Sequence, residues 1–377
     1  MSESYSGGTP SVGVKEYYGG QIPFIRSAEI NSEITELFLT EEGLKKSSAR
    51  LVAMGDILYA LYGATSGEVG RARLRGAINQ AILAINPHTG YDSEYLAQWL
   101  RKSKHSIIET YLQGGQGNLS GTIVKELLVD FPSLKEQRAI GDFFSQLDHL
   151  ITLHQRKYDK LQVLKKAMLE KMFPKNGSSV PEIRFKGFTD AWEQRKLGEI
   201  LQERNTRTSD FESNPLYSLT IESGVTPKTD RYERSSLVTK TEDLFKTVKP
   251  NEFVTNPMNL RFGALGYNKN AFTVSVSGYY DVFSIDDDKC SGFWNAYFKT
   301  PTAMNIFDNA ATGSLIEKRR VKYSTLQQLA FYMPNDLSEK AEIGKYMDTF
   351  DHLITLHQRE LEKLQNIKKS MLEKMFV

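Results

Sequence analysis

The chain has 377 residues, of which 40% are hydrophobic and 25% are charged, and its formal net charge is +2. This length suffices for two or three domains, and the ordinary composition excludes a disordered, collagen-like or disulfide-stapled protein. The near-neutral charge does not by itself indicate a nucleic-acid-binding protein, so any such face must come from local clusters of positive side chains.

Cysteine content and hydropathy indicate the compartment. Cys290 is the only cysteine, so the chain cannot form an internal disulfide or a thiolate metal site, and a reducing environment fits. Residues 1–8 lack the apolar core of a signal peptide, and no window approaches the ~18 apolar residues that a membrane helix needs. We therefore expect a cytoplasmic protein.

Residues 1–135 form a first module in which strands precede a helix. Strand-like runs at 55–61 and 81–85 lead into an aromatic helical stretch at 95–100 and a small-residue loop at 114–119. The candidate phosphate-binding side chains of this module are Lys45, Lys46, Arg50, Arg71, Arg73 and Arg75. The last three alternate along the chain, so on one strand they would point to the same side and could meet phosphates together.

Residues 136–173 predict one long helix, and residues 174–190 predict a linker. Apolar or weakly polar side chains recur in steps of four and three along the helix, as in a coiled-coil seam. The expected interface positions are Leu147, Ile151, His154, Tyr158 and Leu161. No glycine or proline interrupts the helix after Gly141, so it can run for about ten turns. The linker begins with a proline and contains an Asn-Gly pair, both of which end helices.

Residues 191–337 form a second module with the same order of parts. Strand-like runs at 251–254 and 272–276 precede an aromatic helical stretch at 293–298 and a small-residue loop at 311–315. The candidate phosphate-binding side chains of this module are Arg231, Arg234, Arg261, Lys269, Lys318, Arg319 and Arg320. Taken singly, each basic cluster in the two modules is also compatible with an ordinary solvated surface.

The small-residue loops at 113–120 and 313–320 hold parallel positions in the two modules. Gln116 and Asn118 in the first loop and Ser314 in the second carry side chains that can reach base edges, and amides make paired hydrogen bonds with adenine. Glycine in these loops lets a backbone approach DNA closely. Basic groups beside such loops in both modules favour a DNA-binding face over a plain surface.

The C-terminal segment, 338–377, repeats the first long helix. Segments 139–173 and 342–376 align without gaps at a shift of 203 residues and agree at 22 of 35 positions. The expected interface positions of this second helix are Phe350, Ile354, His357, Leu361 and Leu364. A narrow apolar stripe stays exposed to water unless another helix packs against it. We therefore expect the two helices to pair antiparallel about a pseudo-twofold axis. Asp148 and Asp351 are then polar residues of the helix surface or interface.

No catalytic or metal-binding constellation is found in the sequence. The glycine-rich loop at 62–67 lacks the Gly-Lys-Ser/Thr ending of a P-loop, which argues against an NTPase. Asn-Pro-Met-Asn at 256–259 only loosely resembles the Asn-Pro-Pro-aromatic motif of adenine methyltransferases, because the second proline and the aromatic residue are missing. His154 and His357 are expected to pack at the helix interface, since no histidine–carboxylate spacing resembles a hydrolytic metal site.

Several segments resemble one known family. Residues 134–141 with the LDHLITLHQR helix that follows, the link at 180–185, the WEQRKLG opening at 192–198 and the terminus at 371–376 resemble the specificity subunits of type I restriction–modification systems. The resemblance covers the whole chain in architecture and is specific in the helices and the linker. The opening at 192–198 has no counterpart in the first module, which begins inside the corresponding region.

The resemblance implies an α+β fold with two target-recognition domains of mixed α/β character. Two long antiparallel coiled-coil helices would separate these domains in a pseudo-twofold repeat, and each domain would read one half of a bipartite double-stranded DNA site. The resemblance also implies that two adenine-N6 modification (methyltransferase) subunits dock on the helices and that restriction (nuclease/translocase) subunits join them. S-adenosylmethionine, ATP and magnesium would then belong to those partners, and this chain would be non-catalytic.

Two other classes of protein stay open. A coiled-coil scaffold with two protein-binding modules would explain the helices, but not the basic, glycine-bearing loops in both modules. A self-contained DNA methyltransferase would explain DNA binding, but the chain lacks its cofactor and catalytic motifs.

Overall fold

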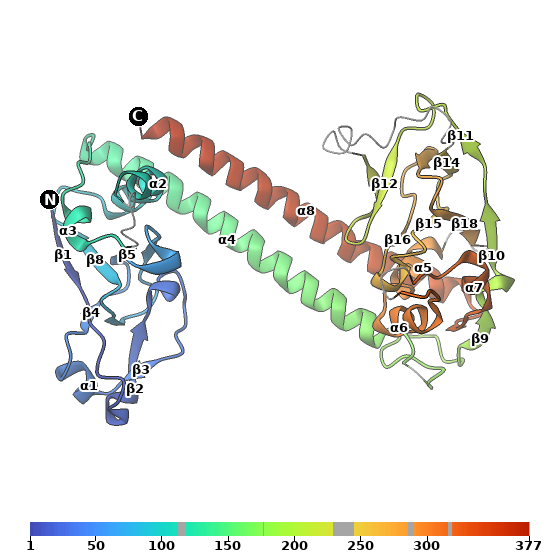
Figure 1. The fold of residues 1–377 in the computed structure, drawn as a ribbon, viewed down its shortest axis with the longest axis horizontal. Helices are drawn as coiled ribbons and strands as arrows, with labels where there is room; N and C mark the ends of the chain where they lie inside the picture. Colours follow the sequence, from blue (N-terminus) through green and yellow to red (C-terminus); the bar gives the residue numbers. More distant parts are fainter. Residues whose placement is uncertain (112–117, 176, 229–244, 286–289, 316–318, 377) are drawn as a thin grey trace. The chain divides into compact units, whose positions relative to one another are not determined.

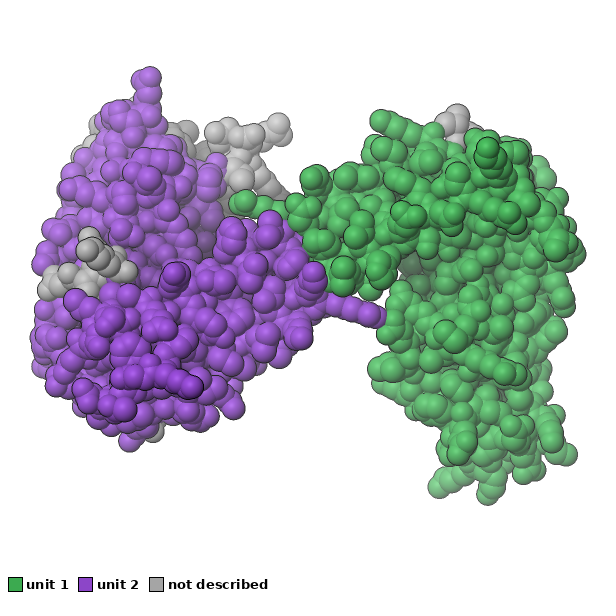
Figure 2. All heavy atoms as spheres, turned by 180° about the vertical axis from the view of Figure 1, so that it is seen from behind, with its two compact units in different colours: residues 1–155, 359–377 green, residues 156–358 purple. Residues whose placement is uncertain are grey.

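A computed structural model of the chain describes residues 1–111, 118–175, 177–228, 245–285, 290–315 and 319–376 (Figure 1). The chain divides into two compact units, one of Met1–Gln155 with Arg359–Val377 and one of Arg156–Gln358 (Figure 2). Each unit therefore combines one module with half of each long helix. Over the described ranges, no helix is both long enough and apolar enough to cross a membrane.

The first unit is built on a four-stranded antiparallel sheet. Its strands lie in the order β1-β8-β5-β6, with the bounds Ser2–Ser6, Ile82–Pro87, Ile57–Ala60 and Val69–Arg71. Alternate side chains divide between the two faces of the sheet. Ile57 and Leu83 pack in one cluster with helix α2 (Ser93–Tyr111), whereas Leu58 and Ile82 belong to a second cluster.

A second sheet and short helices complete this module. The strands lie in the order β3 (Phe38–Leu39), β2 (Tyr18–Ile25), β7 (Gly76–Ile78) and β4 (Arg50–Val52), and β2 pairs parallel with β7. Helices α1 (Glu41–Lys45) and α3 (Gly121–Lys125) begin after Thr40 and Ser120, whose hydroxyls accept backbone hydrogen bonds as N-caps. Single 3-10 turns lie at η1 (Lys15–Tyr17), η2 (Ser27–Glu29) and η3 (Gly63–Thr65).

The second unit contains a sheet of the same topology. Its strands lie in the order β10-β18-β15-β16, again antiparallel, with the bounds Leu201–Arg204, Asp281–Ile285, Phe253–Thr255 and Leu265–Tyr267. Phe253 pairs with Tyr267 in this sheet, and Ile57 pairs with Arg71 at the equivalent place in the first unit. The expectation that both modules share one plan is confirmed.

The two sheets also share their turns. Gly55 and Asn251, with φ of 91° and 67°, adopt the left-handed backbone just before β5 and β15. Gly67 and Gly263, with φ of 79° and 88°, adopt it again before β6 and β16. Only glycine, or more rarely asparagine, takes this conformation at low cost, so the turn residues specify the same chain path in both modules.

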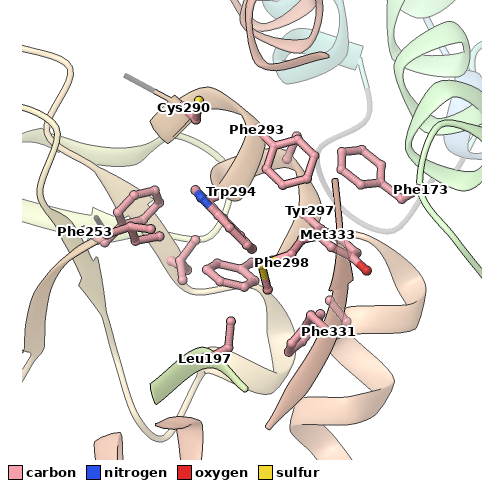
Figure 3. Packing of buried hydrophobic residues seen from close by; sticks show 14 of the residues in the cluster. Phe173, Leu197, Phe253, Cys290, Phe293, Trp294, Tyr297, Phe298, Phe331 and Met333 are labelled. Carbon is pink, nitrogen blue, oxygen red and sulfur yellow. The ribbon is translucent and has the colours of Figure 1, made fainter. Parts of the chain in front are cut away.

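Small sheets and helices surround the second central sheet. The small sheets are β11-β14-β17 (Arg207–Thr208, Phe245–Val248, Val274–Val276), β12-β13 (Tyr217–Thr220, Gly224–Pro227) and β19-β9 (Ala330–Met333, Glu193–Lys196). The helices are α5 (Ser291–Tyr297), α6 (Pro301–Ala310) and α7 (Tyr323–Gln328), with 3-10 turns η4 (Leu197–Glu199) and η6 (Leu260–Phe262). The core of this unit is aromatic, and Figure 3 shows Phe293, Trp294 and Phe298 packed with Phe331 of β19.

Two long helices, α4 (Leu134–Lys171) and α8 (Leu337–Met375), contribute to both units. In the first unit, Asp148 of α4 pairs with Lys368 near the end of α8. In the second, Lys165 near the end of α4 pairs with Asp351 of α8. An early residue of one helix thus meets a late residue of the other, which confirms the predicted antiparallel pairing. The division into recognition domains at residues 135 and 190 stays a prediction.

Candidate nucleic-acid interface

In each unit, a loop before a short helix lies beside the turn that joins two central strands. In the first unit, the Leu119 N–H donates to the Leu61 carbonyl at 2.9 Å. In the second, the Val321 N–H donates to the Pro257 carbonyl, also at 2.9 Å. The two small-residue loops singled out in the sequence therefore end at equivalent places, next to equivalent turns.

The candidate base-reading side chains that the structure describes lie at the surface. Asn118 is exposed, and its backbone forms a bridge with Tyr62, a residue that is 36% exposed. Ser314 is exposed as well. Gln116 and Lys318 lie outside the described residues. An exposed amide beside an exposed ring can hydrogen-bond base edges and stack on bases.

A basic surface of the first module lies at the end of α1 and the start of β4. Lys45, Lys46 and Arg50 are all exposed there. The Arg50 guanidinium carbon lies 3.8 Å from the centre of the Tyr5 ring, a cation–π contact that holds the side chain over the sheet. These three residues keep their candidate role as phosphate contacts.

The prediction that Arg71, Arg73 and Arg75 share one strand is wrong. Strand β6 ends at Arg71, so the other two lie in the connection to β7. Arg71 is half-buried, its pKa is lowered by that burial, and its Nε lies 3.8 Å from Glu94. Arg73 pairs with Glu33 at 2.9 Å, and Arg75 is exposed. The three arginines therefore do not lie in one row along a strand, and their role as phosphate contacts stays a prediction.

Two arginines of the second module stabilise the end of helix α6. Arg261 Nη1 lies 3.0 Å from the Asp308 carboxylate. Arg319 donates through Nη2 to the Asp308 carbonyl at 2.6 Å and through Nε to the Ala311 carbonyl at 3.2 Å. Cations at a helix C-terminus pair with carbonyls that the helix leaves unbonded and complement its dipole. The structure thus gives both side chains an internal role.

The remaining basic candidates of the second module differ in their surroundings. Arg320 is exposed next to the equivalent turn. Lys269 Nζ lies 2.9 Å from Asp348 of α8 and so ties the sheet to the long helix. Arg231 and Arg234 lie outside the described residues. Arg320 therefore keeps its candidate role as a phosphate contact of this module.

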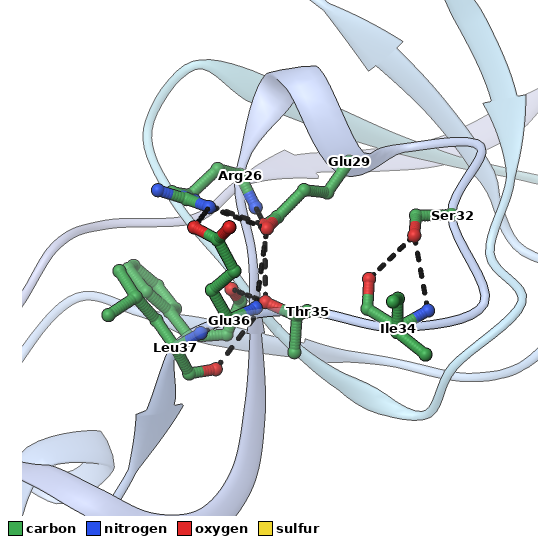
Figure 4. Close-up of polar contacts among 8 residues, drawn as sticks. Arg26, Glu29, Ser32, Ile34, Thr35, Glu36 and Leu37 are labelled. Carbon is green, nitrogen blue, oxygen red and sulfur yellow. Dashed lines mark hydrogen bonds and ion pairs between the residues drawn. The ribbon is translucent and has the colours of Figure 1, made fainter. Parts of the chain in front are cut away.

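A carboxylate network that the sequence analysis missed fixes a loop of the first module (Figure 4). Arg26 Nη2 donates to Glu29 at 2.6 Å and to Glu36 at 2.8 Å, and the Thr35 hydroxyl donates to Glu29 at 3.1 Å. Burial alone would raise the pKa of Glu29, but hydrogen bonds from Arg26 and from backbone N–H groups lower it to about 2. Two carboxylates around one guanidinium leave a negative excess, which disfavours this loop as a phosphate-binding surface.

The ten predicted helix-interface residues are buried or half-buried: Leu147, Ile151, His154, Tyr158, Leu161, Phe350, Ile354, His357, Leu361 and Leu364. In the second unit, Tyr158 and Leu161 of α4 pack against a cluster that includes Phe350 and Ile354 of α8. In the part of the chain that the structure describes, no group of three or more His, Cys, Asp or Glu could hold a metal ion.

Comparison with known proteins connects this architecture to one family. The family model described as "Type I restriction modification DNA specificity domain" matches residues 1–163 and 189–366. The chain is 30% identical over 216 residues to the specificity subunit of the type I restriction enzyme MjaIX of Methanocaldococcus jannaschii, which covers 54% of this chain and 50% of that protein. It is 23% identical over 368 residues to the putative MjaX specificity subunit of the same organism, covering 90% of this chain and 82% of that one.

A solved structure gives the same fold. The crystal structure of a type I restriction–modification S subunit from M. genitalium aligns over 100% of this chain and 96% of its own, with a TM-score of 0.68 and 14% identity. The chain spans about half the length of the first two curated relatives it matches and most of the third. Because the family model covers both modules and most of both long helices, the chain belongs to the family of type I restriction modification DNA specificity domains.

Proposed function

We propose that this chain recognises a bipartite DNA site and directs adenine-N6 methylation and restriction by partner subunits. The observation that carries the proposal is the repetition of one sheet topology and one loop placement in both units. The residues just before Leu119 and Val321 are Asn118 and Arg320, so equivalent positions carry an amide in one module and a guanidinium in the other. Such a pair of modules suits two different half-sites, because base identity is read by side-chain type.

In this proposal the chain itself is not catalytic. Two modification subunits supply methyl transfer from S-adenosylmethionine, and restriction subunits use ATP and magnesium. Membership in a DNA specificity family supports this division of labour, as do relatives that are named specificity subunits of type I restriction enzymes. A coiled-coil scaffold would account for the paired helices but not for that membership.

Mapping of N6-methyladenine in host genomes tests the proposal. Hosts would express the modification subunit alone, this chain alone, or both together. Methylated adenines should appear in a single two-part motif only when both proteins are present. Methylation by this chain alone would show that it is an enzyme, and an unchanged methylome with both proteins would remove the recognition role.

A further inference from the structure

Each module packs on a long helix at a glycine that the repeat places in both helices. Gly141 of α4 lies against the start of α2, where a Cβ would stand 2.7 Å from Asp92 Oδ1 and 3.2 Å from the Tyr95 nitrogen. Gly344 of α8 lies against α5, where a Cβ would stand 2.6 Å from the Phe293 nitrogen. Gly344 follows Gly141 by 203 positions, which is the shift of the repeat. These two glycine contacts are therefore equivalent, and a larger side chain would push the helices apart.

About two turns further along α4, Asp148 holds the same module. Its Oδ2 atom accepts a hydrogen bond from Gln98 Nε2 at 3.0 Å and lies 3.4 Å from Arg101 Nη1, both of α2. Arg101 Nε also donates to the Val69 carbonyl of β6 at 3.2 Å, so the contact reaches the central sheet. The other oxygen, Oδ1, pairs with Lys368 of α8. One carboxylate thus joins the first module to both long helices.

The second unit repeats this aspartate contact with different partners. Asp351 takes the place equivalent to that of the first aspartate, pairs with Lys165 of α4 and lies 3.6 Å from Lys269, which follows β16. Lys269 also lies 2.9 Å from Asp348, and the Tyr267 hydroxyl of β16 donates to Asp348 at 3.1 Å. Carboxylates of a long helix again hold the sheet of the module and the partner helix together.

The glycine contact and the aspartate contact lie seven residues apart on each long helix, or about 10 Å at about 1.5 Å per residue. A module held at one point can turn about that point. Two contacts separated along the helix fix the angle between the module and the helix. Charge-assisted hydrogen bonds suit the second contact because they are strong and have a defined geometry.

We propose that Asp148 and Asp351 are positioning residues that fix the angle of each module and so restrict recognition to one length of spacer between the half-sites. This inference rests on the proposed recognition of a bipartite site. One base pair more or less shifts a half-site by about 3.4 Å and turns it by about 35° around the DNA axis. A module held at one angle cannot follow that turn, whereas a module free to turn about its glycine contact can.

Methylome mapping of a chain with both Q98L and R101M tests the aspartate contact of the first module. The two changes remove the donors to Asp148 and keep side chains of similar size. With the modification subunit, this chain should methylate sites whose spacer is one base pair longer or shorter at least about tenfold more than the unaltered chain does. The loss of one charge-assisted hydrogen bond suffices for that factor. Both half-site sequences should stay unchanged.

Two further chains separate positioning from a general loss of structure. K368M removes the bond of the same carboxylate to α8 and leaves the bonds of the module in place, so its spacer should stay single. A chain with Q98L and R101K should regain the single spacer. Lys299 lies six residues after Phe293 as Arg101 lies six after Tyr95, and the charge of Asp351 acts on it, so a lysine serves at this place in the second module.

Distances within the free chain give a readout that needs no DNA. Spin labels at M54C and Q146C, two exposed positions, report on the first module and on α4, and the native Cys290 is buried. Pulsed electron paramagnetic resonance should give one narrow distance distribution for the labelled parent chain and for its K368M variant. The distribution should be broader when Q98L and R101M are present.

K269M applies the test to the second module at a side chain that is 49% exposed. It should widen the range of spacers and leave the salt dependence of DNA binding unchanged, which a lost phosphate contact would not do. A single spacer for the chain with Q98L and R101M, or a distance distribution as narrow as that of K368M, would overturn the proposal. If that chain loses methylation, the distances and the K269M methylome decide. A missing two-part motif with the unaltered chain would instead remove the recognition role.

Discussion

Asp148 of α4 and Lys368 of α8 form an ion pair in the first unit, with Oδ1 and Nζ 2.5 Å apart. Lys165 of α4 and Asp351 of α8 form the same pair in the second unit with the helices exchanged. Asp351 lies 203 positions after Asp148, and Lys368 lies 203 positions after Lys165, which is the shift that aligns the two repeats. The internal repeat is therefore expressed in side-chain contacts as well as in strand order.

Double-mutant cycles on these two ion pairs should give similar coupling energies. The side chains of Asp148 and Lys368 are 33% and 20% exposed, so we expect about 1 kcal/mol of coupling from D148A, K368A and the double variant. The K165A and D351A cycle should agree within about 0.5 kcal/mol, since the surroundings are related by the repeat. Urea unfolding of the unaltered chain, the four single variants and the two double variants measures both values. Coupling in one cycle and none in the other would contradict the equivalence.

Glu29 should stabilise the first module at neutral pH and not in acid. Its pKa of about 2 in the folded chain lies below the ordinary value of 4.5, so the unfolded chain binds this proton more tightly. The contribution is therefore complete above pH 4.5 and is lost as the pH falls towards 2. An E29Q variant should melt several degrees lower than the unaltered chain at pH 7, and the difference should shrink steadily below pH 4.5.

Thermal melts followed by circular dichroism between pH 7 and 3 measure this difference. E33Q is the matched control, because Glu33 pairs with Arg73 while 56% exposed and a surface pair of this kind contributes little. A constant gap between E29Q and the unaltered chain at every pH would mean that Glu29 acts through packing and not through its charge.

Substitution of Arg319 should affect the stability of the chain, whereas substitution of the neighbouring Arg320 should affect DNA binding. Arg319 bonds the carbonyls at the end of α6, so R319A should lower the melting temperature by a few degrees. Arg320 is exposed, so R320A should leave the melting temperature unchanged. It should also make the plot of log DNA-binding constant against log salt concentration less steep, by the amount that the loss of about one phosphate contact predicts. DNA titrations at four salt concentrations, alongside melts, test both. An unchanged slope for R320A would place the DNA face elsewhere.

The sequence alone predicted the structural features that depend on local patterns of residues or on the internal repeat. The two helices followed from apolar stripes with the same spacing, and the shared plan of the modules followed from similar turns and runs of apolar residues. Contacts between distant residues could not be read in this way. Arg261 and Arg319 look alike as surface cations until Asp308 is seen to lie between them. Arg71 and Arg73 alternate as a strand would require, yet β6 ends at Arg71.

Asn118 and Ser314 should affect different halves of the recognised site. They lie in different modules, each of which is proposed to read one half-site, so their effects should not mix. N118A should relax base preference at one position, costing about 1–3 kcal/mol of discrimination, while the other half-site stays unchanged. S314A should act only on the other half-site. Methylomes of cells expressing each variant with the modification subunit give both readouts, and a change in the same half-site from both variants would contradict one module per half-site.

The long helices should set the distance between the half-sites. Helix α4 has 38 residues and so spans roughly 57 Å at about 1.5 Å per residue, more than the ~34–36 Å between major-groove contacts one DNA turn apart. Four residues inserted after Arg156, with four more after Arg359, fall between the two interhelical ion pairs on both helices. Each ion pair therefore keeps its partners.

This double insertion lengthens both helices by about 6 Å with a little more than one full turn of rotation. At about 3.4 Å per base pair, the recognised site should gain one or two base pairs in its unread spacer, while both half-site sequences stay the same.

A chain with the insertion in α4 alone is the control. It shifts one helix against the other, so it should lose ion pairs, stability and activity. Methylated adenines mapped in cells that express each chain with the modification subunit decide the matter. If the double insertion stays active on a site with the original spacer, the helices do not set the distance, because a rigid pair of lengthened helices could not leave the half-sites where they were.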